Sequence, residues 1–251
     1  MASDTYRYLA KYYDHLFEAQ RSYTSARRTI VQPLLRQVRS ACDLCCGTGT
    51  FAIHLAAKGI ETFGVDLSPD MCRIAAKNAK KAGQKVSIQE ADMRSFRLPH
   101  PVDLITCEYD ALNHVPARGD LARVLRAVAR GLNPGGHFVF DVNNRAAFAS
   151  LWSKTWFIEK DPVALVMQGS HEPGTDKAAV DVIWFVRTGK SYKRHNERIV
   201  EVCWSATEIR QALQQAGFDQ IKKWDASPFF DDYHTPPGNR TFWRARKRPK
   251  S

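Results

Sequence analysis

The segment Asp43-Leu44-Cys45-Cys46-Gly47-Thr48-Gly49-Thr50 constrains the fold of this chain more than any other part of its sequence. Its first residues are typical of a short buried strand, its glycines of a tight loop, and the residues from Thr50 to Ala57 of a helix. Two further apolar runs follow, and they end at Asp66 and Asp92. From residue 40 to residue 142 strand and helix patterns alternate, which predicts βαβ units around a parallel sheet.

The three acids Asp43, Asp66 and Asp92 are expected at one edge of that sheet. The carboxyl ends of parallel strands meet there, and in open α/β sheets this edge binds ligands. Carboxylates in these places suit a cationic group, a ribose diol and an adenine amine. The sequence therefore predicts a pocket for S-adenosylmethionine. Asp43 would face the methionyl end, Asp66 would accept from both ribose hydroxyls, and Asp92 would accept from the adenine amine.

Four more residues complete this expected pocket. Gly47 and Gly49 would let the backbone approach the cofactor closely, because a Cβ atom at either position would collide with it. Leu67 and Met93 would form apolar walls for the adenine ring. All four stand next to the acids in the sequence, so they are expected at the same edge of the sheet.

The glycine loop by itself also fits a dinucleotide, because residues 46–52 satisfy G-x-G-x-x-A. Three features favour S-adenosylmethionine over NAD. Asp43 precedes Gly47 in the strand, where a carboxylate would gain nothing from a nearby pyrophosphate. Asp92 is an acid that the NAD scheme does not require. The chain also has one βαβ series followed by antiparallel strands, which is unlike the two mononucleotide halves of a dinucleotide-binding fold.

The remainder of the chain predicts further elements of the same sheet and one addition to it. Ser68-Pro69-Asp70 is typical of a helix start, and Gly83 of its end. From about residue 156 to residue 204, strand-like runs separated by turn signals predict a small antiparallel sheet over the ligand edge. Ser205-Ala206-Thr207-Glu208 is a capping box for a helix that stops at Gly217.

These elements are interpreted as a single domain, residues 1–251. Its expected parts are an N-terminal helical cap (1–39, with a helix from Tyr6 to Phe17), a cofactor-binding βαβ core (40–142), an antiparallel substrate-side insert (143–204) and a C-terminal part (205–251). The C-terminal part should hold one helix and the last two strands of the main sheet, residues 220–224 and 241–247.

Composition and charge narrow the class of protein. The chain has 251 residues, a net charge of +11 and no apolar stretch near the ~20 residues of a membrane span. Its first residues lack the apolar core of a signal peptide, so we expect a cytoplasmic protein, monomeric or homodimeric, without a membrane partner. The basic charge makes nucleic acid a possible partner. The sequence contains no signature of a nucleic-acid-binding module, so this partner is not favoured. Cys42-x-x-Cys45-Cys46 has no second cluster at zinc spacing, so no metal is expected.

With these motifs in order, the chain resembles the class I S-adenosylmethionine-dependent methyltransferases over nearly its whole length. The matching segments are the D-x-x-x-G-x-G loop, Asp66, Ala91-Asp92-Met93, the strand 103–107 and Leu132-Asn133-Pro134-Gly135-Gly136. The resemblance implies an α/β fold, a Rossmann-like sheet of seven strands with helices on both faces, and the small antiparallel sheet over the active site. It also implies S-adenosyl-L-methionine as cofactor and S-adenosyl-L-homocysteine as product.

Within that superfamily the chain is most similar to a small-molecule group, which includes amino-sugar N,N-dimethyltransferases and glycine/sarcosine methyltransferases. The match rests on Lys11-Tyr12-Tyr13-Asp14, residues 91–96, the loop 108–114, and the insert before residues 212–218. It implies that Tyr13 lies near the cofactor and that His114 borders the reacting atoms. The full set of residues expected at the cofactor is Tyr13, Asp43, Cys45, Gly47, Gly49, Asp66, Leu67, Met71, Asp92, Met93 and Glu108.

The expected reaction is an in-line methyl transfer to nitrogen or oxygen of a small-molecule acceptor. His114 is the candidate general base, because neutral imidazole accepts protons near pH 7; Glu108 and Asp110 are weaker candidates. A structural histidine bonded to a loop carbonyl is the alternative reading of His114. Glu108-Tyr109-Asp110-Ala111 stands where nucleobase amino-methylating enzymes often carry Asn-Pro-Pro-Tyr, which disfavours that activity.

Two other functions stay open, namely a methyltransferase that acts on RNA or protein through its basic surface and a cofactor-binding module without catalysis. The substrate side is expected in the insert and in the loop from Ser227 to His234. Its candidate walls are Trp152, Trp156, Trp184, Trp204 and Tyr233, and its candidate anion-binding residues are Arg194, His195, Arg198 and Arg240.

Overall fold

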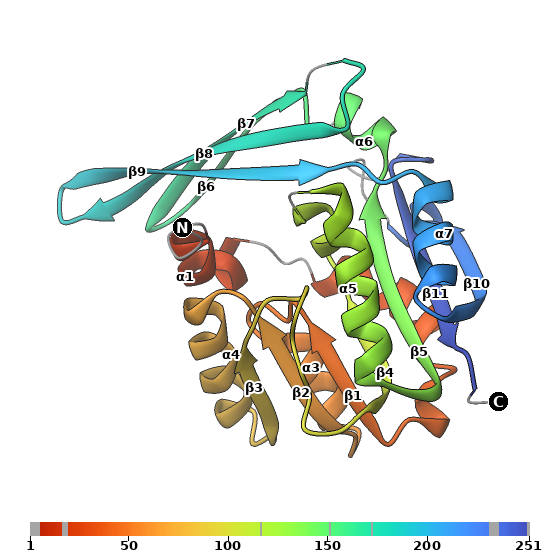
Figure 1. Cartoon of the computed structure of the whole chain (residues 1–251). Coiled ribbons are helices and arrows are strands. Elements are labelled where there is room, and N and C mark those ends of the chain that lie inside the picture. Colours follow the sequence, from red (N-terminus) through yellow and green to blue (C-terminus); the bar gives the residue numbers. More distant parts are fainter. Residues whose placement is uncertain are drawn as a thin grey trace.

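A seven-stranded sheet forms the centre of the computed structural model, with strand order β10-β11-β5-β4-β1-β2-β3 (Figure 1). Five strands are parallel, and β11 runs antiparallel to both of its neighbours. The strands are β1 (Ser40–Leu44), β2 (Glu61–Asp66), β3 (Val86–Glu90), β4 (Val102–Cys107), β5 (Leu132–Asn143), β10 (Phe218–Asp225) and β11 (Arg240–Lys247). The structure describes residues 6–16, 20–115, 117–150, 152–171, 173–230 and 236–249. The predicted fold class is confirmed.

Helices cover both faces of this sheet because its strands are apolar on both sides. In β1, Cys42 and Leu44 join one core cluster and Ala41 joins another, as the alternation of a strand requires. The first cluster includes side chains of α5 (Arg118–Gly131) and α7 (Ala206–Gln215). The second includes side chains of α2 (Gln20–Ala26), the π-helical turn η1 (Arg27–Val31) and α3 (Thr50–Ala56).

Two helix starts follow the capping chemistry that the sequence predicts. Helix α4 (Pro69–Lys81) begins after Ser68, whose side chain accepts a hydrogen bond from the amide of Met71. Helix α7 begins after Ser205, where the serine and Glu208 form a reciprocal capping box. None of the helices in the described part of the chain is long and apolar enough to span a membrane.

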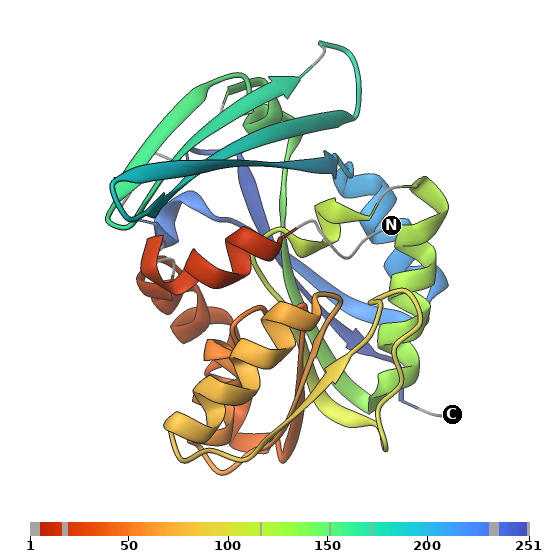
Figure 2. The ribbon, with the colours of Figure 1, turned by 90° about the vertical axis from the view of Figure 1, so that its left-hand side faces the viewer.

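The predicted insert is a separate antiparallel sheet of four strands, in the order β6-β7-β8-β9. The strands are β6 (Thr155–Lys160), β7 (Val163–His171), β8 (Lys177–Thr188) and β9 (Ser191–Val202), and the short helix α6 (Arg145–Ser150) precedes them. Figures 1 and 2 show this sheet across one end of the main sheet, with helix α1 (Arg7–Leu16) between it and α4. Trp184 of β8 and Tyr12 of α1 pack in one cluster.

The structure differs from the sequence prediction mainly around β5. Asn133-Pro134-Gly135-Gly136 is typical of a break between a helix and a strand that begins at His137, but β5 already begins at Leu132. Leu132 pairs with Val102 of β4, and the register then shifts before Leu104 pairs with His137. The proline and glycines therefore form an irregular start of the strand. Helix α6 was not predicted, and Phe17, the expected end of the first helix, lies outside the described residues.

Candidate active site

The carboxylate of Asp66 connects the glycine loop to the end of β2. Its Oδ2 accepts a hydrogen bond from the amide of Gly47, and its Oδ1 accepts one from the amide of Ser68, both at 2.9 Å. Burial raises the pKa of Asp66, and the backbone donors counteract this by favouring the charged form. The structure thus places Asp66 at the loop, and its remaining lone pairs can accept from a ribose diol.

The two glycines of the loop occupy their positions for different structural reasons. Gly47 has a φ of +53°, and a Cβ atom added there would meet no atom within 4 Å. That open space fits a ligand lying against the loop. Gly49 has a φ of +82°, and an added Cβ atom would lie 2.9 Å from the Cβ atom of Ala75 in α4. Close packing of the loop on α4 is a reason for Gly49 that the sequence did not indicate, and its contact with the cofactor stays a prediction.

The predicted adenine side of the pocket is partly apolar and partly charged. Leu67 is 50% exposed beside Asp66, Met71 is buried, and Met93 packs against the main core. An exposed leucine at a strand end provides a surface on which an adenine ring can stack. Asp92 is less available than expected, because Nε of Arg94 lies 3.0 Å from each of its carboxylate oxygens. Its contact with the adenine amine stays a prediction.

Asp43 lies in a buried network of charges at the end of β1. Its Oδ1 accepts a 2.9 Å hydrogen bond from the Thr106 hydroxyl, and Glu108 accepts one of 2.9 Å from Nε of Arg27. Burial raises the pKa of Asp43 to about 7, and the charge of Glu108 raises it as well. The guanidinium of Arg27 also lies 4.0 Å above the ring of Phe51. Arg27, which sequence reasoning missed, thus brings a cation to the network around Asp43.

Helix α1 lies against the glycine loop through Asp14. Its Oδ1 accepts a 2.7 Å hydrogen bond from the Thr48 hydroxyl, and its Oδ2 accepts one of 3.2 Å from Nδ2 of Asn78 in α4. The neighbouring Tyr13 is partly buried, and burial followed by the charge of Asp110 raises the pKa of its hydroxyl. Cys45 has a φ of +59° in the same loop and packs against the main core. The roles of Tyr13 and Cys45 at the cofactor stay predictions.

His114 lies at the end of the 3-10 helix η3 (Ala111–His114) and faces three other side chains. Its Nδ1 is hydrogen-bonded to the Tyr6 hydroxyl at 2.8 Å. Its Nε2 lies 3.6 Å from Oε1 of Glu201 and 3.9 Å from Oδ2 of Asp110. Burial lowers the pKa of His114, so the imidazole is neutral near pH 7 and can accept a proton. Tyr6 and Glu201 were not predicted, because each is far from His114 in sequence.

Behind this cluster, Arg240 is committed to internal ion pairs. Its guanidinium donates to Asp110 at 2.6 Å and to Asp141 at 2.7 Å, and Asp141 also accepts from the Tyr23 hydroxyl at 2.9 Å. We expected Arg240 to meet an anionic group of the substrate. That expectation is wrong, because the carboxylates of Asp110 and Asp141 already use its charge and its donors.

Several residues expected on the substrate side have other roles. Trp184 and Trp204 are buried, and their indole N–H groups donate to Glu197 and to the carbonyl of Leu112, both at 2.9 Å. These two tryptophans belong to the core. Arg198 pairs with Asp181 in exposed surroundings. Residues 231–235, which include the predicted Tyr233, lie outside the described residues.

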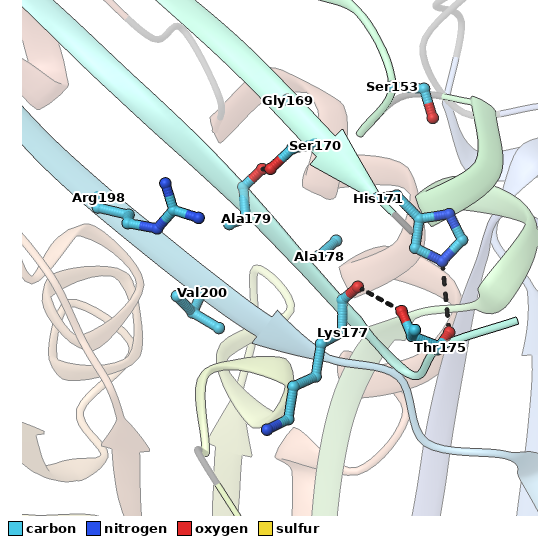
Figure 3. Close-up of a pocket in the computed structure, with 10 residues that line it drawn as sticks. All are labelled: Ser153, Gly169, Ser170, His171, Thr175, Lys177, Ala178, Ala179, Arg198 and Val200. Carbon is cyan, nitrogen blue, oxygen red and sulfur yellow. Dashed lines mark hydrogen bonds between the residues drawn. The ribbon is translucent and has the colours of Figure 1, made fainter. Parts of the chain in front are cut away.

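A separate depression of about 680 Å³ is lined by the insert, and Figure 3 shows its residues. Arg198 and Val200 of β9 line it, and Val200 is 47% exposed while the adjacent Glu201 is 1% exposed. Side chains alternate across a strand, so this depression opens on the face of the insert opposite Glu201. It does not share the residues around His114.

Comparison with known proteins identifies the activity. Residues 41–136 match the family described as "Methyltransferase domain". A crystal structure of an S-adenosylmethionine-dependent methyltransferase from Clostridium acetobutylicum ATCC 824 superimposes with a TM-score of 0.80, at 25% sequence identity, over 97% of this chain and 99% of that chain. The chain is an S-adenosylmethionine-dependent methyltransferase. This methyltransferase uses S-adenosylmethionine as its cofactor.

Two further proteins show how far the similarity extends. The Bacillus subtilis (strain 168) protein YqeM, which is named a methyltransferase, is 29% identical over 209 residues, covering 82% of this methyltransferase and 83% of YqeM. The sugar N-methyltransferase KedS8 from Streptoalloteichus sp ATCC 53650 superimposes with a TM-score of 0.74 over 99% of this chain and 94% of that chain. Its 20% identity shows a shared fold.

Proposed function

We propose that this methyltransferase transfers a methyl group to an amine nitrogen of a small molecule. The observation that carries the proposal is the set of polar atoms around His114. Nε2 of His114 and one carboxylate oxygen each from Asp110 and Glu201 lie within 4.8 Å of one another. The distances from Nε2 to the two carboxylates, 3.6 and 3.9 Å, are too long for hydrogen bonds from the imidazole, whereas Glu201 and Asp110 share a side-chain hydrogen bond with each other. A nitrogen placed among the three could be bound by all of them.

The charge of the surroundings favours an acceptor that arrives as a cation. Asp110, Asp141 and Glu201 lie together, and Arg240 pairs with Asp110 and Asp141. Burial and the charge of Asp110 raise the pKa of Glu201, and a cation placed beside it would favour its ionised form. An ammonium group would be attracted to such a site, whereas an anionic acceptor would be repelled. The name of KedS8, a sugar N-methyltransferase with the same fold, points to the same kind of acceptor atom.

The residues of the two halves of the site then have distinct tasks. Asp66, Leu67 and the space at Gly47 would hold the cofactor, and the insert with α1 would exclude water from the reacting groups. Bound there, S-adenosylmethionine supplies a methyl group to which the nitrogen lone pair bonds as the carbon–sulfur bond breaks. The amine must first lose a proton, and neutral His114 is the group placed to accept it. Such a base contributes about 10²–10⁴-fold, and alignment in a dry site about 7–11 kcal/mol.

A transfer assay with labelled S-adenosylmethionine tests this function. We would incubate the enzyme with matched panels of amines (amino sugars and amino acids) and of phenols and alcohols, and would identify the methylated atom by mass spectrometry. Methylation confined to amines is the expected result. Product from phenols or alcohols alone would reject nitrogen as the acceptor.

Bulk tRNA and denatured protein would be included as acceptors, because the net charge of +11 suits an anionic macromolecule. Methylation of tRNA that falls steeply with added salt, with no product from either small-molecule panel, would assign the enzyme to nucleic acid instead. Calorimetry with S-adenosylmethionine beforehand would establish that the preparation binds its cofactor.

A further inference from the structure

We infer that the outer face of the insert is the surface through which two copies of this enzyme form a symmetric dimer. The outer face is the side of β6-β7-β8-β9 opposite α1 and Glu201, and Figures 1 and 2 show it turned away from the main sheet. The described residues include four exposed large apolar side chains. Phe157, Tyr192 and Val200 lie on the outer face, and Leu67 lies at the expected cofactor pocket. The inference does not depend on the acceptor of the methyl group.

The pairing of the strands places side chains in rows across the outer face, because residues paired on neighbouring strands point to the same side of a sheet. One row, on β6, β7, β8 and β9 in turn, consists of Phe157, Val166, Ile183 and Asn196. The next row consists of Glu159, Ala164, Phe185 and Arg194. An apolar centre on β7 and β8 is thus bordered by charged side chains on the two edge strands, as in many protein interfaces.

The row that begins at Glu159 is complementary to its own reverse. A two-fold axis that runs along the strands, between β7 and β8, lays β7 of one copy on β8 of the other and β6 on β9. Ala164 then faces Phe185 of the second copy, so that a small side chain meets a large one. Glu159 faces Arg194 of the second copy, so that opposite charges meet at both ends of the row. Such self-complementarity is what a surface for a second copy of the same chain requires.

The row that begins at Phe157 fits the same axis. Phe157 is 63% exposed on β6, and the residue at the other end of its row is Asn196 on β9. A depression of about 320 Å³ lies there, and Ile183, Arg194 and Asn196 are among the residues that line it. The axis places Phe157 of each copy over this depression of the other. Two exposed phenylalanine rings are buried in this way.

The outer face is large enough for a specific dimer. Neighbouring strands lie about 4.8 Å apart and rise about 3.3 Å per residue, so four strands as long as β7, with its nine residues, present roughly 600 Å². Two such faces together bury about 1,200 Å², which exceeds the roughly 1,000 Å² that a specific interface needs.

Analytical ultracentrifugation of the full chain over a range of concentrations tests the inference. The wild type should sediment as a dimer. Phe157→Lys should raise the Kd of the dimer about 100-fold or more, because two buried rings are lost and each lysine lies near Arg194 of the other copy. Ser87→Lys, which adds the same charge at an exposed position of β3, is the control and should leave the Kd unchanged. A monomeric wild type, or a dimer that tolerates Phe157→Lys, would overturn the inference.

Exchange of charges tests the axis itself. Glu159 and Arg194 lie three strand spacings apart within one chain, about 14 Å, so they cannot pair with each other there. Glu159→Lys and Arg194→Glu each place like charges face to face twice, and each alone should weaken the dimer about 10-fold. An equimolar mixture of the two variants should form heterodimers with nearly the wild-type Kd, because both contacts then join opposite charges. A mixture as weak as the separate variants would contradict this axis. Both positions are exposed, so this experiment decides the matter even if Phe157→Lys does not fold.

Discussion

The hydroxyl of Thr48 donates a 2.7 Å hydrogen bond to Oδ1 of Asp14, and this bond joins the first helix to the glycine loop. Asp14 also accepts from Asn78 of α4, so one carboxylate connects α1 to both elements that border the expected cofactor. Closure of α1 over the loop and binding of the cofactor should therefore be linked.

Asp14→Asn should weaken cofactor binding without unfolding the protein. Replacing the carboxylate removes hydrogen bonds to a charged group, which contribute about 1.5–3 kcal/mol, and α1 would then cover the loop less of the time. Calorimetry should show a Kd for S-adenosylmethionine about 10-fold higher than in the wild type. Asp70→Asn, which alters an exposed pair with Arg73 on α4, is the control and should bind normally.

Asp66→Ala should abolish measurable binding of S-adenosylmethionine. The substitution removes the acceptor that holds the Gly47 amide and the acceptor proposed for the ribose diol. The matched change is Glu90→Ala, because Glu90 is the exposed residue paired with Asp66 on the adjacent strand. Unchanged calorimetric affinity in Asp66→Ala would refute the assignment of the pocket.

Gly47→Ala and Gly59→Ala form a pair that separates backbone strain from ligand contact. Both glycines have positive φ, +53° and +78°, and neither has an atom within 4 Å of an added Cβ. Each alanine should therefore cost about 1–2 kcal/mol of unfolding free energy. Only Gly47→Ala should also lose cofactor affinity, because its methyl group fills the space at the loop. Equal affinity in the two variants would remove Gly47 from the site.

His114→Ala should lower kcat about 10²-fold or more while the affinity for S-adenosylmethionine stays within a factor of about two. The loss affects the proton transfer, and the cofactor contacts lie on other residues. Steady-state assays of the proposed amine methylation, with calorimetry on the same preparations, check both numbers. His100→Ala, an exposed histidine near Glu61, is the control. An unaltered rate in His114→Ala would mean that this histidine has a structural role and does not accept the proton.

Asp43 should make the free enzyme less stable as the pH rises. Its pKa is raised to about 7 in the folded state, mainly by burial, while the unfolded chain has the ordinary value near 4. The folded state therefore binds more protons between about pH 4 and pH 7, and the free energy of unfolding falls as the pH rises through that window. Asp141, with a pKa raised to about 6, acts in the same direction.

Asp43→Asn should remove part of this dependence. Urea unfolding at pH 5 and pH 8 should show a smaller loss of stability in the variant than in the wild type, by up to about 3 kcal/mol. Measurements are made without cofactor, whose positive charge would favour the ionised carboxylate. A loss of stability from pH 5 to pH 8 that is as large in Asp43→Asn as in the wild type would contradict the burial effect assigned to Asp43.

Features that depend on neighbours in sequence were predicted well. Ser68-Pro69 and the Ser205 capping box begin helices because each uses side chains and amides within four residues. The strand ends at Asp43 and Asp66 were predicted because apolar runs stop there. Gly49 shows the limit of such reasoning: the glycine was expected, but its close neighbour is Ala75, and only the packing of the loop on α4 reveals it.

Contacts between distant segments could not be predicted in this way. Glu201 reaches His114 because β9 alternates and its end is bound to Asn113, and neither the register nor the bond is visible in the sequence. Arg27 reaches Glu108 from the π-helical turn η1, which no local pattern indicates. Arg240 was predicted to bind an anionic group because of its charge. Its two aspartate partners come from β5 and from the loop after β4, so this pairing is not visible in the local sequence.

The side-chain amide of Asn113 donates to the carbonyls of Asn143 and Val202, and this link has a consequence for how acceptor preference can diversify among related enzymes. It ties only the last residues of β9 to the chemistry, while β6, β7 and the far end of β8 carry no such bond to the turn at His114 in the described residues. Mutations can accumulate in those strands and reshape the wall that meets the acceptor. The proton-accepting group would keep its place throughout, so new substrates can be acquired without rebuilding the catalytic centre.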